Sequence, residues 1–143
     1  MFEQLKLENQ LCFPMYACAK EIIRLYKPWL DPLDLTYTQY LVMLVLWEKE
    51  QVTVKALGEA LWLDSGTLTP VLKKLEAKGR ISRRRTEEDE RSVLISLTEA
   101  GKALRDQAAE VPASVGASVK LPPEESAELY RLLYQVLAGL RES

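Results

Sequence analysis

The most reactive side chain in this sequence is the thiol of Cys12. The chain has one other cysteine, Cys18, and no histidine, so it lacks the commonest metal ligand and the commonest general base. Two thiols with scattered carboxylates also make a poor zinc site. We therefore expect no metal, no cofactor and no enzymatic activity, and a cysteine as the reactive group.

The position of Cys12 favours its thiolate form. It lies at the start of a helix expected over residues 11–30, just before Pro14, which marks the first turn. Free backbone N–H groups and the positive end of the helix dipole stabilise a thiolate there, and the thiolate attacks a peroxide to give sulfenic acid. Phe13, Met15 and Tyr16 supply apolar surface that suits an organic peroxide better than hydrogen peroxide. From the cysteine alone, a buried small hydrophobic residue is the alternative.

Cys18 is badly placed to form a disulfide with Cys12. It lies six residues further along, which on one helix is about 240° round and about 9 Å along the axis. That gap exceeds the reach of a disulfide bond. We therefore expect Cys18 to lie in the core.

Positive charge is concentrated in one central stretch of the chain. The formal net charge is −2, but residues 73–91 hold eight Lys or Arg against five Asp or Glu. Both flanking parts of the chain are acidic. Because phosphate binding needs local rather than global charge, DNA is a candidate partner.

The apolar pattern predicts a largely helical chain. Segment 40–47 is apolar nearly all round, which is typical of a buried central helix, and Thr36 and Thr53 are N-cap residues for the helices that follow them. The expected helices cover residues 11–30, 37–50, 54–63, 65–78, 99–110 and 124–140, with a break at Pro112 and 113–118 and two strands, 81–85 and 92–97, around a charged tip, 86–90.

A turn-linked helix pair followed by a β-hairpin is a winged helix-turn-helix. We therefore predict a mainly α fold with a small β-hairpin. Short polar side chains at a helix start suit base edges, lysines further along suit phosphates, and hairpin arginines suit a narrow minor groove. The alternatives are that these Ser and Thr residues only cap the helix and that the tip charges only pair. The predicted DNA-binding residues are Ser65, Thr67, Thr69, Lys73, Lys74, Arg83, Arg84, Arg85 and Arg91, with Asp89 supporting the wing tip.

The two ends of the chain are predicted to form a dimer interface. Residues 5–30 and 121–140 form amphipathic helices far in sequence from the helix-turn-helix, and a reader of palindromic DNA needs a two-fold axis. We predict a single domain, 1–143, with dimerisation helices in 1–35 and 99–143 and the DNA-binding region in 36–98. The alternative is that the two ends pack on each other within one chain.

The central part of the chain resembles the MarR family of regulators. The resemblance covers residues 63–76 and Gly79, the arginines 83–85, and the wing pattern Asp89-Glu90-Arg91 followed by 94–98. The Asp-x-Arg wing followed by Leu-Thr is fairly specific to that family. The resemblance implies a winged-helix dimer, joined through its terminal helices, on a pseudo-palindromic operator. It also implies that residues 65–69 face the major groove and that Arg91 enters the minor groove.

The N-terminal part resembles the organic-hydroperoxide-sensing branch of that family, OhrR. The matching segments are 6–13, Tyr16, 26–28, 35–41 and 63–68. The resemblance implies that Cys12 is the peroxide sensor and that Tyr26 and Tyr37 hydrogen-bond to its sulfur, in part from the other subunit. Because no cysteine follows Cys18, the chain resembles the one-cysteine type, which needs a small thiol or overoxidation to lock the released state.

The sequence thus predicts a cytoplasmic transcriptional repressor that releases its operator when an organic hydroperoxide oxidises Cys12. It has no apolar run of about 18 residues and no signal-peptide pattern at its start. One alternative is a MarR-type repressor released by a non-covalent phenolic ligand. A weaker alternative is a thiol peroxidase, against which no second cysteine is placed to resolve turnover. A purely protein-binding role leaves the arginine-rich wing unexplained.

Overall fold

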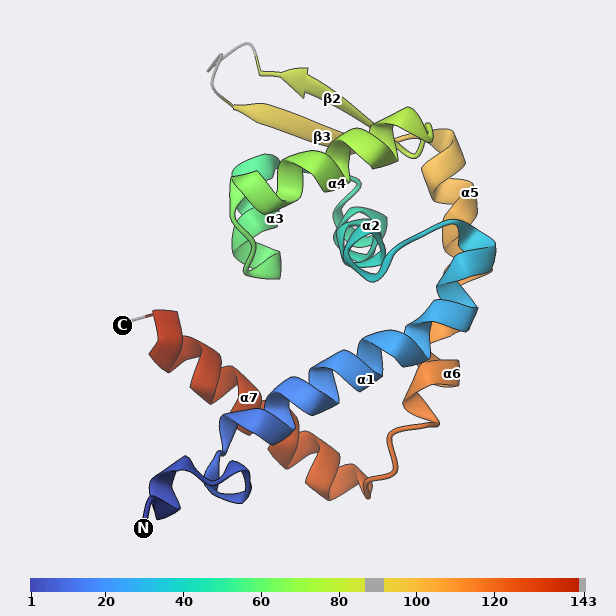
Figure 1. The fold of residues 1–143 in the computed structure, drawn as a ribbon. Helices are drawn as coiled ribbons and strands as arrows, with labels where there is room; N and C mark the ends of the chain where they lie inside the picture. The colour runs from blue at the N-terminus through green and yellow to red at the C-terminus, as the bar shows by residue number, and fades with distance from the viewer. Residues whose placement is uncertain (87–91, 142–143) are drawn as a thin grey trace. The chain divides into compact units, whose positions relative to one another are not determined.

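The structure, a computed structural model, describes residues 1–86 and 92–141, so the predicted wing-tip residues Asp89 and Arg91 lie outside the described residues. The chain divides into two compact units, Met1–Pro112 and Ala113–Ser143. Figure 1 shows the elements of both units. In chain order they are α1 (Cys12–Leu30), α2 (Tyr37–Lys49), β1 (Gln51–Thr53), α3 (Val54–Leu61), α4 (Ser65–Ala77), β2 (Ile81–Arg85), β3 (Val93–Leu97), α5 (Glu99–Ala108), α6 (Val111–Gly116) and α7 (Pro123–Arg141).

Helix α2 is the centre of the first unit. It is in contact with α1, α3, α4 and α5, and Figure 1 shows α3, α4 and α5 standing around it. Val42, Met43 and Leu46 are fully buried, as the nearly all-apolar segment predicts. A fully buried side chain of this size stabilises a fold by roughly 1.5–3 kcal/mol. Leucines of the two neighbouring helices complete this core: Leu57, Leu68, Leu72 and Leu75.

Side-chain caps begin the helices of the DNA-binding region. Thr36 Oγ1 accepts a hydrogen bond from the N–H of Gln39 at 3.2 Å, and Gln39 Oε1 accepts one from the N–H of Thr36 at 3.1 Å. This reciprocal capping box satisfies two N–H groups that the helix itself leaves unpaired at the start of α2. Thr53 caps α3 in the predicted way, and Thr98 caps α5.

The hairpin is part of a three-stranded antiparallel sheet with the order β1-β3-β2. Strands β2 and β3 confirm the predicted hairpin. Strand β1 was not predicted, because its three residues carry no readable alternation and pair with β3, far away in sequence. Val52 lies opposite Ile95 in this pairing, and both side chains are buried beneath the helices.

Helix α1 has little core contact within its own chain. Leu30 is its one buried residue, whereas Ile22, Ile23 and Trp29 are exposed. The expectation that Cys18 lies in the core is therefore wrong for the single chain, in which Cys18 is exposed. The predicted helix is present, but the described part of the first unit contains no surface that buries the apolar side chains of α1 other than Leu30.

The second unit contains the C-terminal helix α7. None of the described residues of α7 is buried, and its apolar side chains, Leu129, Leu132, Leu133 and Val136, are about two-fifths exposed. The predicted break at Pro112 and 113–118 is wrong in part, because α6 begins at Val111. Proline lacks an N–H, and the first turn of a helix does not need that donor, so Pro112 is tolerated there. Neither α7 nor any other helix in the described part of the chain is long and apolar enough to cross a membrane.

Candidate DNA-binding and thiol sites

The start of α4 presents short polar side chains on an exposed surface. Asp64 caps the helix, and its Oδ1 accepts a hydrogen bond from the N–H of Thr67 at 2.7 Å. This bond holds the pKa of the Asp64 carboxyl below its usual value. The backbone donor at Thr67 is therefore already engaged by a carboxylate, so we expect the side chains, more than free N–H groups, to meet the DNA.

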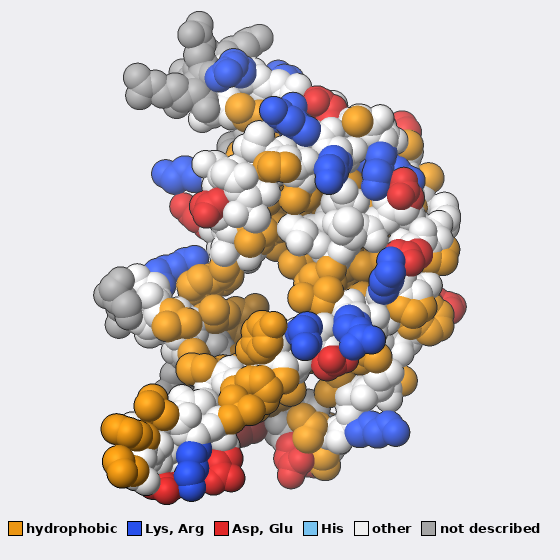
Figure 2. Space-filling view, in the orientation of Figure 1, with side chains coloured by type: hydrophobic (Ala, Val, Ile, Leu, Met, Phe, Trp, Pro, Cys, Tyr) orange, Lys and Arg blue, Asp and Glu red, His pale blue; other side chains and the backbone are white. Residues whose placement is uncertain are grey.

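The predicted residues of α4 are all at least partly accessible. Ser65 and Thr67 are exposed and Thr69 is half-buried. Thr69 Oγ1 donates to the carbonyl oxygen of Ser65 at 2.7 Å, so the hydroxyl proton is engaged, and the methyl group and the oxygen lone pairs are the parts able to contact a base. Lys73 and Lys74 are exposed further along the same helix. Figure 2 shows Lys and Arg side chains over the part of the first unit that carries α4 and the hairpin.

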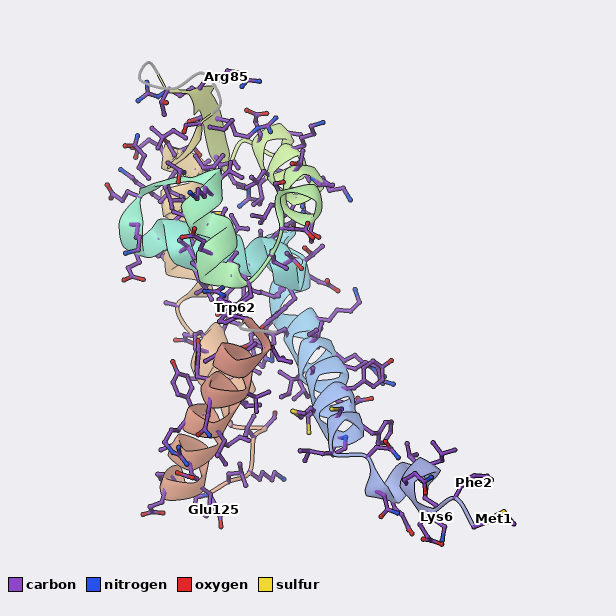
Figure 3. All side chains as sticks on the ribbon, turned by 90° about the vertical axis from the view of Figure 1, so that its left-hand side faces the viewer. Met1, Phe2, Lys6, Trp62, Arg85 and Glu125 are labelled. Atoms are coloured by element: carbon purple, nitrogen blue, oxygen red, sulfur yellow. The ribbon has the colours of Figure 1, made fainter. Side chains whose placement is uncertain are left out.

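The arginines of β2 divide into two kinds. Arg83 is half-buried and donates two hydrogen bonds to one carboxylate oxygen of Glu76 on α4, Oε1, from Nε at 3.2 Å and from Nη2 at 3.0 Å. Arg84 and Arg85 are exposed, and Arg85 lies at the far end of the hairpin from the helices (Figure 3). The geometry makes Arg83 a brace between the hairpin and the recognition helix, a role that its sequence position did not reveal.

The C-terminal end of α4 is anchored to the segment that precedes α2. Lys78 Nζ donates to the carbonyl oxygen of Asp34 at 2.6 Å and to Gln39 Oε1 at 3.2 Å, and it lies 3.4 Å from Asp34 Oδ2. Gln39 is only 2% exposed. This network was not predicted, although the Thr36-x-x-Gln39 spacing is the signature of a capping box and points to Gln39.

Cys12 is exposed and is the first residue of α1. The helix therefore begins one residue later than the predicted start at residue 11. Of the predicted peroxide-pocket residues, Phe13 and Tyr16 are exposed and Met15 is half-buried. A shallow cavity of about 810 Å³ next to the start of α1 is lined by Phe13 and Pro14 together with residues 6–8 and Gln10. The first turn of α1 thus offers an accessible thiol beside apolar surface.

The two predicted sulfur-contacting tyrosines are brought together by the fold. The rings of Tyr26 on α1 and Tyr37 on α2 have centroids 4.8 Å apart, and Tyr40 lies 5.5 Å from Tyr26. Burial raises the pKa of Tyr37, with Tyr26 as a second cause, and burial raises that of Tyr40 to about 12. The hydroxyls of Tyr37 and Tyr40 therefore remain protonated, and able to donate a hydrogen bond, well above neutral pH.

The tyrosine pair does not reach Cys12 of its own chain. Cys12 and Tyr26 lie at opposite parts of the same helix, fourteen residues apart, which at 1.5 Å per residue is about 21 Å along the axis. A hydrogen bond needs about 3 Å between heavy atoms. A contact between these groups therefore requires a second copy of the chain.

The fold and these surfaces define a winged helix-turn-helix regulator. The three-helix block α2–α4, the wing β2–β3 and the polar start of α4 are the parts with which this class of protein reads DNA.

Comparison with known proteins identifies the family. The family model described as transcriptional regulator SarA/Rot matches residues 24–108. The organic hydroperoxide resistance transcriptional regulator of Bacillus subtilis (strain 168) is 52% identical over 141 residues, which is 99% of this chain and 96% of that protein.

Solved structures agree with this result. Reduced AbfR bound to DNA has a TM-score of 0.81 at 38% identity, covering 96% of each chain. Overoxidized AbfR bound to DNA has a TM-score of 0.78 at 37% identity, covering 96% of this chain and 97% of that one. The apo form of MarR from E. coli has a TM-score of 0.70 at 30% identity, covering 90% and 97%. The chain belongs to the MarR family of transcriptional regulators, in the branch of the organic hydroperoxide regulators.

Proposed function

We propose that this chain is a homodimeric repressor that binds a pseudo-palindromic operator while Cys12 is reduced and releases it after an organic hydroperoxide oxidises Cys12. The observation that carries the proposal is the exposed Cys12 at the first residue of α1, in a chain whose Tyr26 lies about 21 Å further along the same helix, against Tyr37 of α2. If Cys12 comes from one subunit and the tyrosines from the other, oxidation of the thiol acts directly on the dimer interface. The name of the B. subtilis relative supports organic hydroperoxides as the signal.

The dimer would be formed by the apolar rows that each unit leaves exposed. On α1 these include Ile22, Ile23 and Trp29, and on α7 they include Leu129 and Leu133. Helices with an uncovered apolar stripe are stabilised when a second copy buries it. We retain segments 1–35 and 99–143 as the dimerisation regions and 36–98 as the DNA-binding region. A two-fold axis then places two copies of α4 on two half-sites.

In the DNA complex, we assign distinct roles to the exposed side chains of α4 and the wing. Ser65, Thr67 and the Thr69 methyl group meet base edges in the major groove, where a threonine methyl packs on a thymine methyl. Lys73 and Lys74 contact phosphates and orient the protein. Arg84 and Arg85 extend this basic surface along the wing, and Arg83 holds the wing to α4. Arg91 in the minor groove, supported by Asp89, remains a prediction from the sequence.

The proposed sensor site joins Cys12 of one subunit to Tyr26 and Tyr37 of its partner. Phe13, Met15 and Tyr16 provide the apolar surface for the organic part of the peroxide. The tyrosine hydroxyls donate to the sulfur anion and to the oxygen that becomes negative as the peroxide bond breaks. The raised pKa of Tyr37 supports this role, because only the protonated phenol donates.

The chemistry is a two-electron oxidation of sulfur. The Cys12 thiolate attacks the distal peroxide oxygen, an S–O bond forms and the O–O bond breaks, and the alkoxide leaves and takes up a proton to become an alcohol. The sulfenic acid then reacts with a small thiol, which gives a mixed disulfide and water. Cys18 of the same chain is not the resolving thiol, because no geometry on one helix brings it to Cys12.

We propose the mixed disulfide as the form that leaves the operator. AbfR has been seen bound to DNA in its overoxidized form, so in that relative overoxidation is compatible with the complex. A thiol adduct is far larger than added oxygens, and it would displace the partner tyrosines from the first turn of α1. That displacement changes the dimer interface and with it the spacing of the two α4 helices.

As a DNA-binding regulator, the protein would act in the cytoplasm, where the operator is, and without catalytic turnover. The test is operator binding before and after one equivalent of an organic hydroperoxide with a small thiol, with and without dithiothreitol. We expect binding to be lost on oxidation and restored by reduction, and Cys12→Ser to bind DNA but ignore peroxide. Retained binding after complete oxidation would refute the redox trigger and favour a non-covalent ligand. Continuous peroxide consumption would favour a thiol peroxidase.

A further inference from the structure

A single ammonium group connects the segment before Tyr37 to the end of the recognition helix. Lys78, the C-cap residue of α4, donates to the Asp34 carbonyl oxygen at 2.6 Å and to Gln39 Oε1 at 3.2 Å. Its ion pair with Asp34 Oδ2, at 3.4 Å, adds to these bonds. The side chain of Lys78 is 27% exposed, against 74% for Asp34. The lysine is therefore the more buried partner of the ion pair, and its bond to Gln39, a residue only 2% exposed, is the part of the network that is sheltered from water.

The acceptors of Lys78 surround the backbone that orients Tyr37. Asp34 has φ 55, a left-handed conformation that non-glycine residues adopt at a cost. Gln39 Oε1 also accepts from the N–H of Thr36, so one oxygen joins the start of α2 to the lysine. Tyr37 lies between these two points as the first residue of α2. A displacement of Tyr37 is therefore expected to move the Asp34 carbonyl group and the Gln39 side chain, to which Lys78 is hydrogen-bonded.

At its other end, α4 carries the residues assigned to base edges. The helix spans Ser65–Ala77, about 20 Å at 1.5 Å per residue. A tilt of about 10° about its anchored end moves its first turn by about 3.5 Å over that length. Base contacts need donor–acceptor distances near 3 Å, so a tilt of this size removes them.

We propose that Lys78 is a positioning residue that transmits the state of the sensor tyrosines to the recognition helix. This inference rests on the proposed function, in which oxidation of Cys12 displaces Tyr37. Lys78 is not among the residues assigned to the thiol site or to DNA contact. Its contribution is to make the α2 start and the α4 end move together. Without it, the tyrosines can shift while α4 keeps its DNA-binding position.

The test compares operator affinity in the reduced and oxidised states for wild type and Lys78→Met. The methionine keeps the apolar stem and removes the three donors. We expect the reduced protein to bind as wild type within about threefold, and the loss of affinity on oxidation to shrink by about tenfold, which is within the usual range of coupling between sites. Lys78→Arg, which keeps the charge and can reach the same oxygens, should retain the wild-type response.

Lys102→Met is the matched control. Lys102 is also partly buried and lies near Glu50 and Glu99, at 3.9 and 3.6 Å, and both of these ion-pair partners lie outside α4. Its response to peroxide should equal that of wild type. Oxidation of Cys12 is followed separately by mass spectrometry and should be unchanged in every variant. Lys78→Gln replaces the methionine variant if that one does not fold.

The outcomes separate the two proposals. If wild-type protein keeps its operator after Cys12 is fully oxidised, the proposed function fails and this inference fails with it. If wild type is released and Lys78→Met is released equally, Lys78 does not transmit the signal and only this inference fails. A variant that loses DNA binding while reduced, or whose Cys12 oxidises more slowly, also overturns it, because Lys78 would then shape α4 or the sensor itself.

Discussion

A mixed dimer tests whether the thiol of one subunit works with the tyrosines of the other. One chain carries Cys12→Ser and the other carries Tyr26→Phe with Tyr37→Phe. If the site forms between subunits, the remaining Cys12, on the double-Phe chain, meets the intact tyrosines of the Cys12→Ser chain. If the site formed within a chain, the same cysteine would face two phenylalanines.

The structure sets the size of the expected difference. Cys12 and Tyr26 are separated by about 21 Å along α1, so no intrachain contact compensates for a missing partner. A hydrogen bond to a charged group contributes about 1.5–3 kcal/mol, and 1.36 kcal/mol is tenfold in rate. Loss of both hydroxyls should therefore slow oxidation of Cys12 by about 100-fold or more in the double-Phe homodimer.

The assay is loss of the Cys12 thiol after a stopped-flow pulse of an organic hydroperoxide. All chains carry Cys18→Ser, because Cys18 is exposed in the single chain and would add signal. The mixed dimer is isolated through two different affinity tags. We expect its single Cys12 to react at the wild-type rate, while the double-Phe homodimer is slow. A mixed dimer as slow as the double-Phe homodimer would refute the intersubunit site.

Three further predictions follow from individual contacts. Gly101→Ala places a Cβ against the carbonyl oxygen of Arg80 and 2.7 Å from Leu97 Cδ1, so it should lower the free energy of unfolding in urea by about 1–3 kcal/mol. Gly116→Ala, whose Cβ meets nothing within 4 Å, is its control and should leave the urea midpoint nearly unchanged. Because burial raises the pKa of Tyr40 to about 12, its stabilising contribution should be fully present below about pH 10 and be lost as the pH rises toward 12; Tyr40→Phe should remove the last step of the tyrosinate absorbance titration, and an unchanged titration would contradict the assignment. Lys73→Ala should weaken binding to all DNA sequences alike and reduce the slope of log affinity against log salt by about one, whereas a sequence-selective loss would mean that Lys73 reads bases.

Much of the fold could be predicted from the sequence because its signals are local. Thr36, Thr53 and Thr98 are caps that satisfy N–H groups within three residues, and the apolar run of α2 needs burial in any fold. Strands β2 and β3 are neighbours in sequence. Strand β1 could not be found in this way, because its pairing with β3 joins residues more than forty positions apart.

The candidate site was predicted in its residue types but not in its arrangement. The chemistry of Cys12, Tyr26 and Tyr37 is a property of their side chains, and the family resemblance carried their roles. Whether a given arginine is available to DNA depends on its neighbours: Arg83 is paired with Glu76, seven residues away across an element boundary. No periodicity encodes that pair.

The sequence by itself therefore determined which groups can react, which segments form helices and where DNA-binding charge is concentrated, since each depends on residues close in the chain. The tertiary structure decided what those groups can reach. It placed Tyr26 against Tyr37, fixed Lys78 on Asp34 and Gln39, and kept both tyrosines far from Cys12 of their own chain. The physical reason is distance: contacts between residues far apart in sequence arise only when packing of the helices sets their relative positions.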